Sequence, residues 1–247
     1  MIKKYDIYYH NGRETVKNNR KDGTMFPGKG SAERPGCKDV FRAFLVENAI
    51  YEGDFEIPRI LPVDVKPNKL VAFSKALTSE NHDTWIHFYE DDVVFERIWN
   101  NPRRYLPIIK KFEGVIAPDF SLYRDMPLVM QLWNIYRSHA IASWLQENGV
   151  PVIANVRWGD ERTFAVCCNG VPKYATIAVG SHGCIKYRNE REYFTDGLKY
   201  IAQKLKPKVI IVYGTAPDEI FEQYRQKGIE ILQFDSEYMI AHSRAVV

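Results

Sequence analysis

Residues 83–125 read DTWIHFYEDDVVFERIWNNPRRYLPIIKKFEGVIAPDFSLYRD. The run opens with β-branched and aromatic residues, closes on a second apolar run, VIAPDFS, and places acidic residues after both. Between them, Asn101 and Pro102 have the residue types of an N-cap and a first helical position, in a helix that ends before Gly114. The stretch therefore predicts strand, helix, strand.

The same alternation continues to the C-terminus. Further strands are expected at PVIANVRWGD, ATIAVGSHG, KVIIVYGTAP and IEILQFDS, with helices between them over 126–149, 190–205 and 219–228. Strands that alternate with helices indicate right-handed βαβ units and a mainly parallel sheet. We expect an α/β domain over residues 68–247, with about six strands and flanking helices. The pattern fits an open doubly wound sheet and an incomplete barrel equally well.

Three local features carry expectations of their own. LVAFSKA at 70–76 is a strand candidate, and the short connection to the next strand predicts antiparallel pairing or a place at the sheet edge. In the longest helix, Val129, Trp133 and Ala140 belong to a stripe at helical spacing that is expected to face the core. Gly149 is expected to end this helix.

Residues 1–67 have a different character. They are expected to form an irregular segment, rich in Gly, Pro and charge, with three prolines between 58 and 67. Residues 1–42 hold ten basic and five acidic side chains. A basic arm is compatible with a nucleic acid or nucleotide partner, and equally with a solvated tail.

Composition limits the class of protein. The chain has 247 residues, 45% of them hydrophobic and 26% charged, which is ordinary for a globular protein. No apolar run approaches the ~20 residues of a membrane span, and the N-terminal residues lack the apolar region of a signal peptide. The four cysteines form no CxxC pair, and adjacent Cys167 and Cys168 are expected to point to opposite faces of a strand. We expect reduced thiols in a cytoplasmic protein.

Polar residues gather where the predicted strands end. Because parallel strands deliver their carboxyl ends to a common edge, these side chains are expected to line one site. They are Glu90, Asp91, Asp92, Asp119, Ser121, Asn155, Arg157, Asp160, Ser181, His182, Cys184, Tyr213, Asp235 and Ser236.

Residue types assign tentative roles within this set. Carboxylate oxygens suit Mg²⁺ or Mn²⁺, so the candidate metal ligands are Asp91, Asp92, Asp119 and Asp235. The candidate catalytic residues are Asp91, Asp119, Asp235 and His182. Candidate ligand-binding residues are Arg157, which suits a phosphate or carboxylate, with Trp158, Ser121, Asn155 and Tyr213. Each aspartate also has a structural interpretation as a helix cap or turn residue.

Several unusual motifs occur in one order: HFYEDDVVFERIWNNPRRY, APDFSLYRDMP, QLWNIYR, NVRWGD, GSHGC and IIVYG. Together they resemble an uncharacterised family, a domain of unknown function found in bacteria, archaea and phages, often in mobile elements. The resemblance covers about residues 84–235. It implies a soluble cytosolic α/β protein and a phage or plasmid setting, and it assigns no catalytic residue.

Three functional hypotheses follow. The first is a metal-dependent enzyme of phosphoryl or phosphodiester chemistry on nucleic acid or nucleotides. The second is a non-catalytic protein that binds DNA or a host protein. The third is a hydrolase that uses a pair of carboxyl groups, Asp119 with Glu90 or Asp91, as acid and base.

Overall fold

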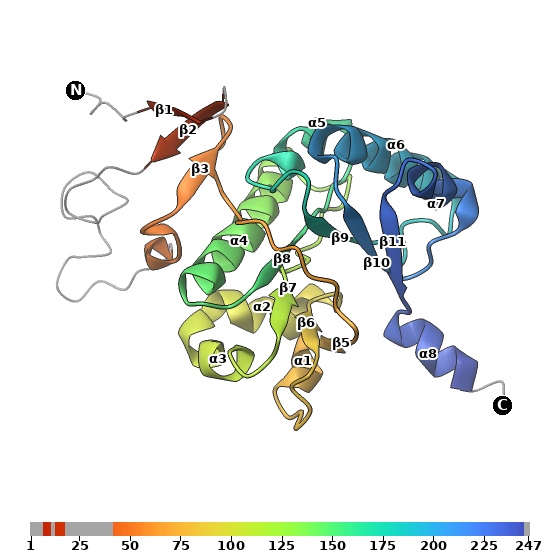
Figure 1. Cartoon of the computed structure of the whole chain (residues 1–247), viewed down its shortest axis with the longest axis horizontal. Coiled ribbons are helices and arrows are strands. Elements are labelled where there is room, and N and C mark those ends of the chain that lie inside the picture. The colour runs from red at the N-terminus through yellow and green to blue at the C-terminus, as the bar shows by residue number, and fades with distance from the viewer. Residues whose placement is uncertain (1–6, 11–12, 18–41, 245–247) are drawn as a thin grey trace.

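The computed structural model describes residues 7–10, 13–17 and 42–244, and Figure 1 shows the arrangement of their elements. The main sheet has seven strands in the order β5–β6–β7–β8–β9–β10–β11, and every neighbouring pair is parallel. The strands are β5 Leu70–Ala72, β6 Trp85–His87, β7 Gly114–Ile116, β8 Val152–Asn155, β9 Thr176–Gly180, β10 Val209–Tyr213 and β11 Glu230–Phe234. Strand order follows chain order throughout, so the sheet has the topology of an incomplete barrel.

Helices connect these strands and cover the outer face of the curled sheet. They are α1 Phe73–Ala76, α2 Asp92–Asn100, α3 Pro102–Ile109, α4 Leu128–Glu147, α5 Glu161–Phe164, α6 Arg188–Leu205 and α7 Asp218–Arg225, with α8 Glu237–Arg244 after the last strand. A 3₁₀ turn, η2 Val166–Cys168, follows α5. Among the described helices, none is long and apolar enough to cross a lipid bilayer.

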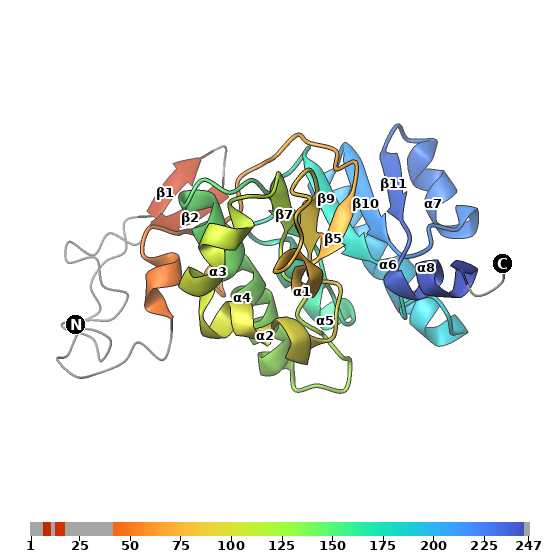
Figure 2. The same ribbon diagram turned by 90° about the horizontal axis from the view of Figure 1, so that it is seen from below.

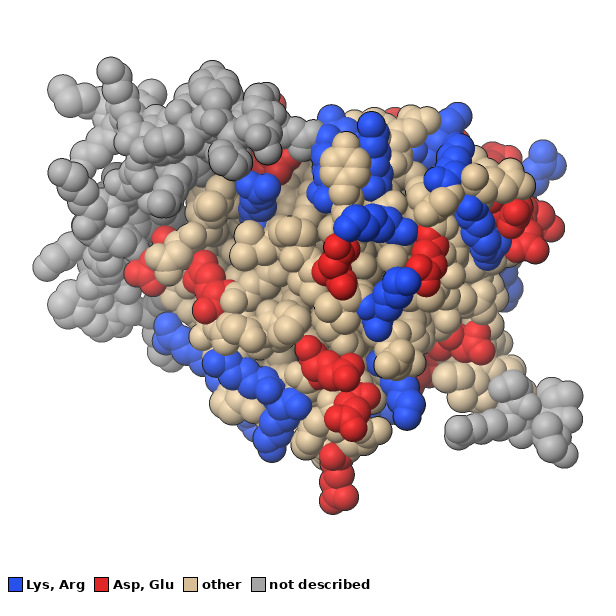
Figure 3. Space-filling model, viewed as in Figure 1, with Lys and Arg blue, Asp and Glu red and all other residues tan. Residues whose placement is uncertain are grey.

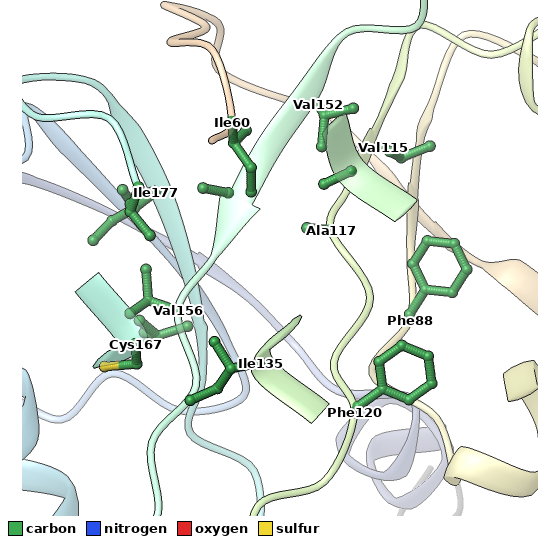
Figure 4. Packing of buried hydrophobic residues seen from close by; sticks show 14 of the residues in the cluster. Ile60, Phe88, Val115, Ala117, Phe120, Ile135, Val152, Val156, Cys167 and Ile177 are labelled. Atoms are coloured by element: carbon green, nitrogen blue, oxygen red, sulfur yellow. The ribbon is translucent and has the colours of Figure 1, made fainter. Parts of the chain in front are cut away.

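The two faces of the curled sheet bury different sets of apolar residues. The inner face holds one residue from each of five consecutive strands, Trp85, Ile116, Ile153, Ala178 and Ile211, all at most 2% exposed. The alternate residues face outward and join the larger core beneath the helices. Figure 4 shows part of that core, where apolar side chains of β7, β8 and β9 gather with Ile135 of α4.

The two edge strands approach each other across the open side of the barrel. Lys66, before β5, lies 2.5 Å from Glu230 at the start of β11. At the opposite end, Lys75 of α1 lies 2.7 Å from Glu237, just beyond β11. These exposed pairs contribute little stability, but they show that the seven-stranded sheet nearly closes on itself.

Part of the segment before residue 68 also packs against this body. A second, antiparallel sheet is formed by β1 Ile7–His10, β2 Arg13–Lys17, β3 Ile50–Glu52 and β4 Ile57–Pro58. Figure 2 shows it beside α4, together with the 3₁₀ turn η1 Ala43–Val46. Leu45, Val46, Ile57 and Ile60 are fully or almost fully buried in the common core, so residues 43–60 are less irregular than expected. Most of the basic arm, with Cys37, lies outside the described residues, and the boundary at residue 68 stays a prediction.

Three local predictions need correction. Residues 70–76 form a three-residue strand and one turn of helix, and this turn lets β5 pair parallel with β6 at the sheet edge. The antiparallel alternative is therefore wrong. Cys167 and Cys168 lie in a 3₁₀ turn, not a strand.

The helix α4 also differs from expectation at its beginning. Val129 and Trp133 are 71% and 44% exposed, because the helix buries the polar residues Gln131 and Asn134 there instead. Its end is as predicted, since Gly149 adopts a φ of 81° directly after the helix.

Candidate functional site

A chain of hydrogen bonds joins three strand ends at the carboxyl edge of the sheet. The Tyr89 hydroxyl, beyond β6, donates to Asn155 Oδ1 at the end of β8, at 2.9 Å. Asn155 Nδ2 donates to Asp119 Oδ1, beyond β7, at 2.7 Å. Arg157 Nη1 donates to Asp119 Oδ2 at 2.9 Å. The predicted convergence of Asp119, Asn155 and Arg157 is therefore present in the structure.

Burial affects the pKa values of the charged groups in this chain of hydrogen bonds. The Asp119 side chain is 9% exposed, and its burial raises the carboxyl pKa despite the opposing effects of Arg157 and Asn155. The neighbouring Asp119 raises the pKa of Arg157, so that guanidinium keeps its charge at all relevant pH values. Arg157 remains 23% exposed. Within the described part of the chain, its Nε and Nη2 groups make no hydrogen bond, so they remain available to a ligand.

Aromatic rings fill the barrel mouth beside this chain. Tyr89 and Tyr213 stack with ring centroids 4.6 Å apart and an interplanar angle of 11°. The ring of His87 lies 4.6 Å from Tyr213. His87 Nδ1 accepts the Tyr89 backbone N–H at 3.2 Å, and burial, aided by Lys75, lowers the His87 pKa to about 3. His87 is therefore a neutral side chain that helps to fix the position of Tyr89.

A cavity of about 870 Å³ opens next to Arg157, between the loops that follow β7, β8 and β9 and the first turns of α6. Gly180 leaves room for Tyr89 here, because a Cβ at this position would lie 3.1 Å from the Tyr89 ring, a tight contact. The cavity is lined by Leu122, Tyr123, Arg124, Asp125, Val156, Arg157, Trp158, Gly159, Asp160, Gly180, His182, Gly183, Cys184, Glu190, Tyr193 and Phe194.

Ion pairs hold the walls of this cavity. Arg124, from the loop before α4, pairs with Glu190 of α6, and its guanidinium lies 4.1 Å from the centroid of the Tyr193 ring. Asp160 caps α5 and lies 2.7 Å from Arg162, whose hydrogen bonds lower the Asp160 pKa. Asp160, whose structural interpretation from the sequence is a turn residue, is the N-cap of α5 in the structure.

Trp158 contributes an apolar wall to the cavity. Its ring packs against Phe194, and its indole N–H donates to the Tyr193 carbonyl at 3.2 Å. Gly197 of α6 permits this packing, since a Cβ there would lie 2.1 Å from the Trp158 nitrogen. At 9% exposure Trp158 supports the wall and offers a ligand little surface.

The loop after β9 supplies two further groups. His182 is exposed on the cavity wall, and its ring lies 5.7 Å from Tyr238 of α8. Cys184 is half-buried, and burial raises the pKa of its thiol, an effect that Arg157 opposes. Ser181 is fully buried and donates to the Thr215 carbonyl at 2.7 Å, so it holds the loop in place.

The remaining predicted residues lie outside the Asp119 network. Both carboxylate oxygens of Asp92 accept hydrogen bonds from Ser121, whose hydroxyl is 2.9 Å away. Asp91 is exposed at the start of α2. Asp235 is exposed and accepts from Gln233 at 3.0 Å. Tyr213 reaches the site only through its ring, while its hydroxyl accepts the Glu237 N–H at 3.2 Å.

These positions bear on the expected metal. Among the described residues, no group of three or more His, Cys, Asp or Glu side chains could hold a metal ion. Asp119 is bonded to Asn155 and Arg157, and Asp92 to Ser121, so neither has an oxygen without a protein partner. The described residues therefore offer Mg²⁺ or Mn²⁺ no complete set of protein ligands, and the binding of such an ion stays a prediction.

Sequence reasoning missed Tyr89, His87, Arg124 and Tyr193. His87 and Tyr89 alternate along HFYEDD, and this period of two was the available signal that both face the barrel interior. Arg124 and Tyr193 come from a loop and a helix, where no local pattern marks a residue that lines a cavity.

Comparison with other proteins shows that the chain is similar to two phage proteins. It is 34% identical over 185 residues to the Gene 1 protein of Mycobacterium phage L5, an alignment that covers 73% of this chain and 80% of that protein. It is 32% identical over 163 residues to the Gene 1 protein of Mycobacterium phage D29, which covers 65% of this chain and 60% of that protein.

No solved structure matches this chain significantly. Residues 49–235 match a family described as a domain of unknown function, DUF4417, and this stretch contains all seven strands of the curled sheet and the cavity at its mouth. The chain therefore belongs to the DUF4417 family.

Proposed function

We propose that this phage-type protein binds a small phosphate-bearing molecule, a nucleotide, in the cavity at the carboxyl ends of β7, β8 and β9. One observation carries the proposal. Arg157 is a permanently charged group on the cavity wall, and Asp119 engages only one of its nitrogens.

The fixed position of Arg157 is what favours a phosphate. Asp119 and Asn155 hold the guanidinium on one side, so it does not need to be ordered when a ligand binds. Its free Nε and Nη2 groups form the planar fork that suits two oxygens of a phosphate. A lysine at this position would offer a point charge without that geometry.

Size and wall chemistry favour a nucleotide over free phosphate. Small-molecule sites usually enclose roughly 300–1,000 Å³, and this cavity has about 870 Å³. Tyr123 and Tyr193 on its wall are 60% and 36% exposed, which leaves ring faces on which a base can stack. Arg124 and Glu190 supply further polar contacts beside Tyr193.

Phosphoryl or phosphodiester chemistry with Mg²⁺ or Mn²⁺ is the enzymatic form of this proposal. Mg²⁺ is commonly held by one or two carboxylates together with phosphate oxygens of the substrate. Asp125 and Glu190 line the same cavity and are the nearest candidates for that role. The paired-carboxylate hydrolase is not supported in the same way, since Glu90 is bonded to Ser74 and Asp91 is not part of the cavity wall.

Isothermal titration calorimetry tests the proposal. Adenosine monophosphate, adenosine triphosphate and inorganic phosphate are titrated into the full chain with and without Mg²⁺. The test variant is Asp119→Asn with Arg157→Gln, which removes the charge and leaves no unpaired buried ion. The control is Arg225→Gln, which removes a half-buried arginine paired with Asp218 and outside the cavity lining.

Charge-assisted hydrogen bonds contribute about 1.5–3 kcal/mol each. Because the double variant loses them, it is expected to bind the nucleotide at least tenfold more weakly. The control is expected to bind like the wild type. Equal affinity in the double variant and the wild type, or no binding of any phosphate compound, would remove Arg157 from the proposal. Release of phosphate from adenosine triphosphate, measured on the same samples, separates a binding protein from an enzyme.

A further inference from the structure

A second cavity, of about 440 Å³, lies at the opposite end of the barrel, where β10 and β11 begin. Its walls carry four lysines and no carboxylate. The lining residues are Lys199, Ala202, Gln203, Lys206, Pro207, Lys208, Gln223, Tyr224, Lys227, Gly228 and Ile229. Figure 3 shows several Lys and Arg side chains over this upper right part of the molecule, where α6 and α7 lie in the same view of Figure 1.

Most of these lysines lack a counter-charge. Lys208 lies 2.6 Å from Asp64. Lys199, Lys206 and Lys227 have no carboxylate within 4.0 Å in the described part of the chain. Lys206 is the C-cap of α6 and Lys227 follows the C-cap of α7, so the negative ends of these helices favour a basic residue at both positions. Lys199, which lies within α6 before its last turn, has no such explanation.

The backbone beside the cavity is held in an unusual conformation. Tyr174 and Lys206 both adopt the left-handed region, with φ of 55° and 49°, which is rare for side chains of this size. The Tyr174 N–H donates to the Leu205 carbonyl at 3.0 Å, and the Lys208 N–H donates to Ala175 at 3.2 Å. These bonds join the segment of Tyr174 to the segment of Lys206 and Lys208, and Tyr174 is 57% exposed.

Tyr224 adds a buried hydrogen-bond donor. The residue is 2% exposed, and its hydroxyl has no hydrogen-bond partner among the described residues. The Lys227 ammonium lies 5.9 Å from the centroid of its ring. Burial raises the Tyr224 pKa to about 12, so the hydroxyl keeps its proton and can only gain by finding an acceptor.

We propose that this end of the barrel binds the phosphodiester backbone of a single-stranded nucleic acid. Lys199, Lys206 and Lys227 contact phosphates, and the exposed ring of Tyr174 stacks against a base. A basic groove combined with an exposed aromatic ring is the arrangement that binds single strands without sequence preference. This surface lies at the opposite end of the barrel from the cavity at Arg157.

Fluorescence anisotropy with a labelled 12-nucleotide oligothymidine tests this proposal on the full chain. The first variant is Lys199→Gln with Lys227→Gln. The second is Tyr174→Asn, because asparagine tolerates the left-handed conformation. The matched control is Lys110→Gln with Lys111→Gln, which removes the same charge near the end of α3. Calorimetric melting confirms that each variant is folded.

The lysine variant is expected to bind about tenfold more weakly than the control. Its salt dependence, the slope of log K against log salt concentration, should fall by about 1.4, since each lost phosphate contact on a single strand contributes about 0.7. Tyr174→Asn should weaken binding with the slope unchanged. The proposal fails if both lysine pairs reduce binding equally, or if a 12-base-pair duplex binds as tightly as the single strand.

This test is independent of the proposed function. The Asp119→Asn/Arg157→Gln variant should keep its affinity for oligothymidine, and Lys199→Gln/Lys227→Gln should keep its affinity for adenosine monophosphate. If either variant loses its affinity for both oligothymidine and adenosine monophosphate, the two cavities do not act as separate sites.

Discussion

The carboxyl and amino ends of the barrel differ in how their charged side chains are paired and buried. At the carboxyl end, Arg157 and Arg124 are each paired with a carboxylate, and Asp119 is almost completely buried. At the amino end, four lysines share a cavity, and among the described residues only Lys208 is paired with a carboxylate, that of the exposed Asp64. The first arrangement fixes side chains in position before a ligand arrives. The second leaves positive charge that a polyanion can neutralise.

This difference indicates where a substitution can change ligand binding without changing the stability of the fold. A charge that is buried and paired cannot be removed alone without destabilising the fold, because its partner is left without compensation. An exposed, unpaired charge can be removed at little expense to stability. The two ends should therefore respond differently to equivalent substitutions.

The largest expected effect is at the carboxyl end. Asp119→Ala leaves Arg157 without its counter-ion and is expected to lower the free energy of unfolding by about 3 kcal/mol. Asp64→Ala, which removes the exposed partner of Lys208, should lower it by less than about 1 kcal/mol. Urea denaturation of both variants measures the difference. Similar losses in the two would show that Asp119 is not the more deeply buried partner.

A second prediction concerns pH and His87. Its pKa is lowered from 6.5 to about 3, so the folded state resists a proton that the unfolded chain accepts below pH 6.5. Stability is therefore lost as pH falls from about 6.5 towards 3, by about 1.4 kcal/mol per pH unit from this residue. Between pH 6.5 and 5 the expected loss is about 2 kcal/mol.

His87→Gln should remove this part of the pH dependence. His139, buried in α4 with a pKa lowered to about 4, contributes in the same direction and remains in the variant as an internal reference. Urea denaturation at pH 6.5 and pH 5 is the measurement. If the variant and wild type lose the same free energy over this range, His87 is not held neutral by the fold.

Where apolar runs alternate with helices, the sequence predicted an α/β body of about six strands, and the structure has seven in its main sheet. The sequence could not choose between an open sheet and a barrel, because strand order depends on how successive units stack and leaves no local pattern. The contact of His87 on β6 with Tyr213 on β10 arises from sheet curvature, which residue spacing does not encode.

The candidate site was predictable in part. Asp119, Asn155 and Arg157 follow apolar runs, and the common carboxyl edge of a parallel sheet brings them together. Asp91 and Asp235 follow the same rule, yet they are exposed, because position after a strand does not fix which way a loop side chain points. Nothing in the chain's pattern marked the amino-end lysines, which derive from a helix, two loops and a strand start.

A third prediction compares the half-buried Tyr89 with the buried Tyr224. The Tyr89 hydroxyl is bonded to Asn155, whereas the Tyr224 hydroxyl has no partner within the described residues. Tyr89→Phe is expected to lower the free energy of unfolding by about 1 kcal/mol, since Asn155 loses a donor. Tyr224→Phe should be neutral or slightly stabilising, because it removes an unsatisfied polar group.

Urea denaturation again gives the two values, and oligothymidine binding adds a second measurement. Should the Tyr224 hydroxyl meet a phosphate in the complex, Tyr224→Phe binds the oligonucleotide more weakly while remaining as stable as the wild type. A clear loss of stability in Tyr224→Phe would mean that the hydroxyl has an acceptor within the protein.

The smallest expected effect is that of the unpaired lysines on stability. Lys199 and Lys227 line one cavity without a carboxylate, so their mutual repulsion opposes folding weakly, and salt screens it. Lys199→Gln/Lys227→Gln should therefore be at least as stable as the wild type. The expected gain in the free energy of unfolding is at most about a few tenths of a kcal/mol, as for other exposed charge interactions. The difference should shrink as NaCl rises from 20 to 200 mM. A destabilised variant would indicate that these lysines are paired with groups of the protein, and the contrast between the two ends of the barrel would then be lost.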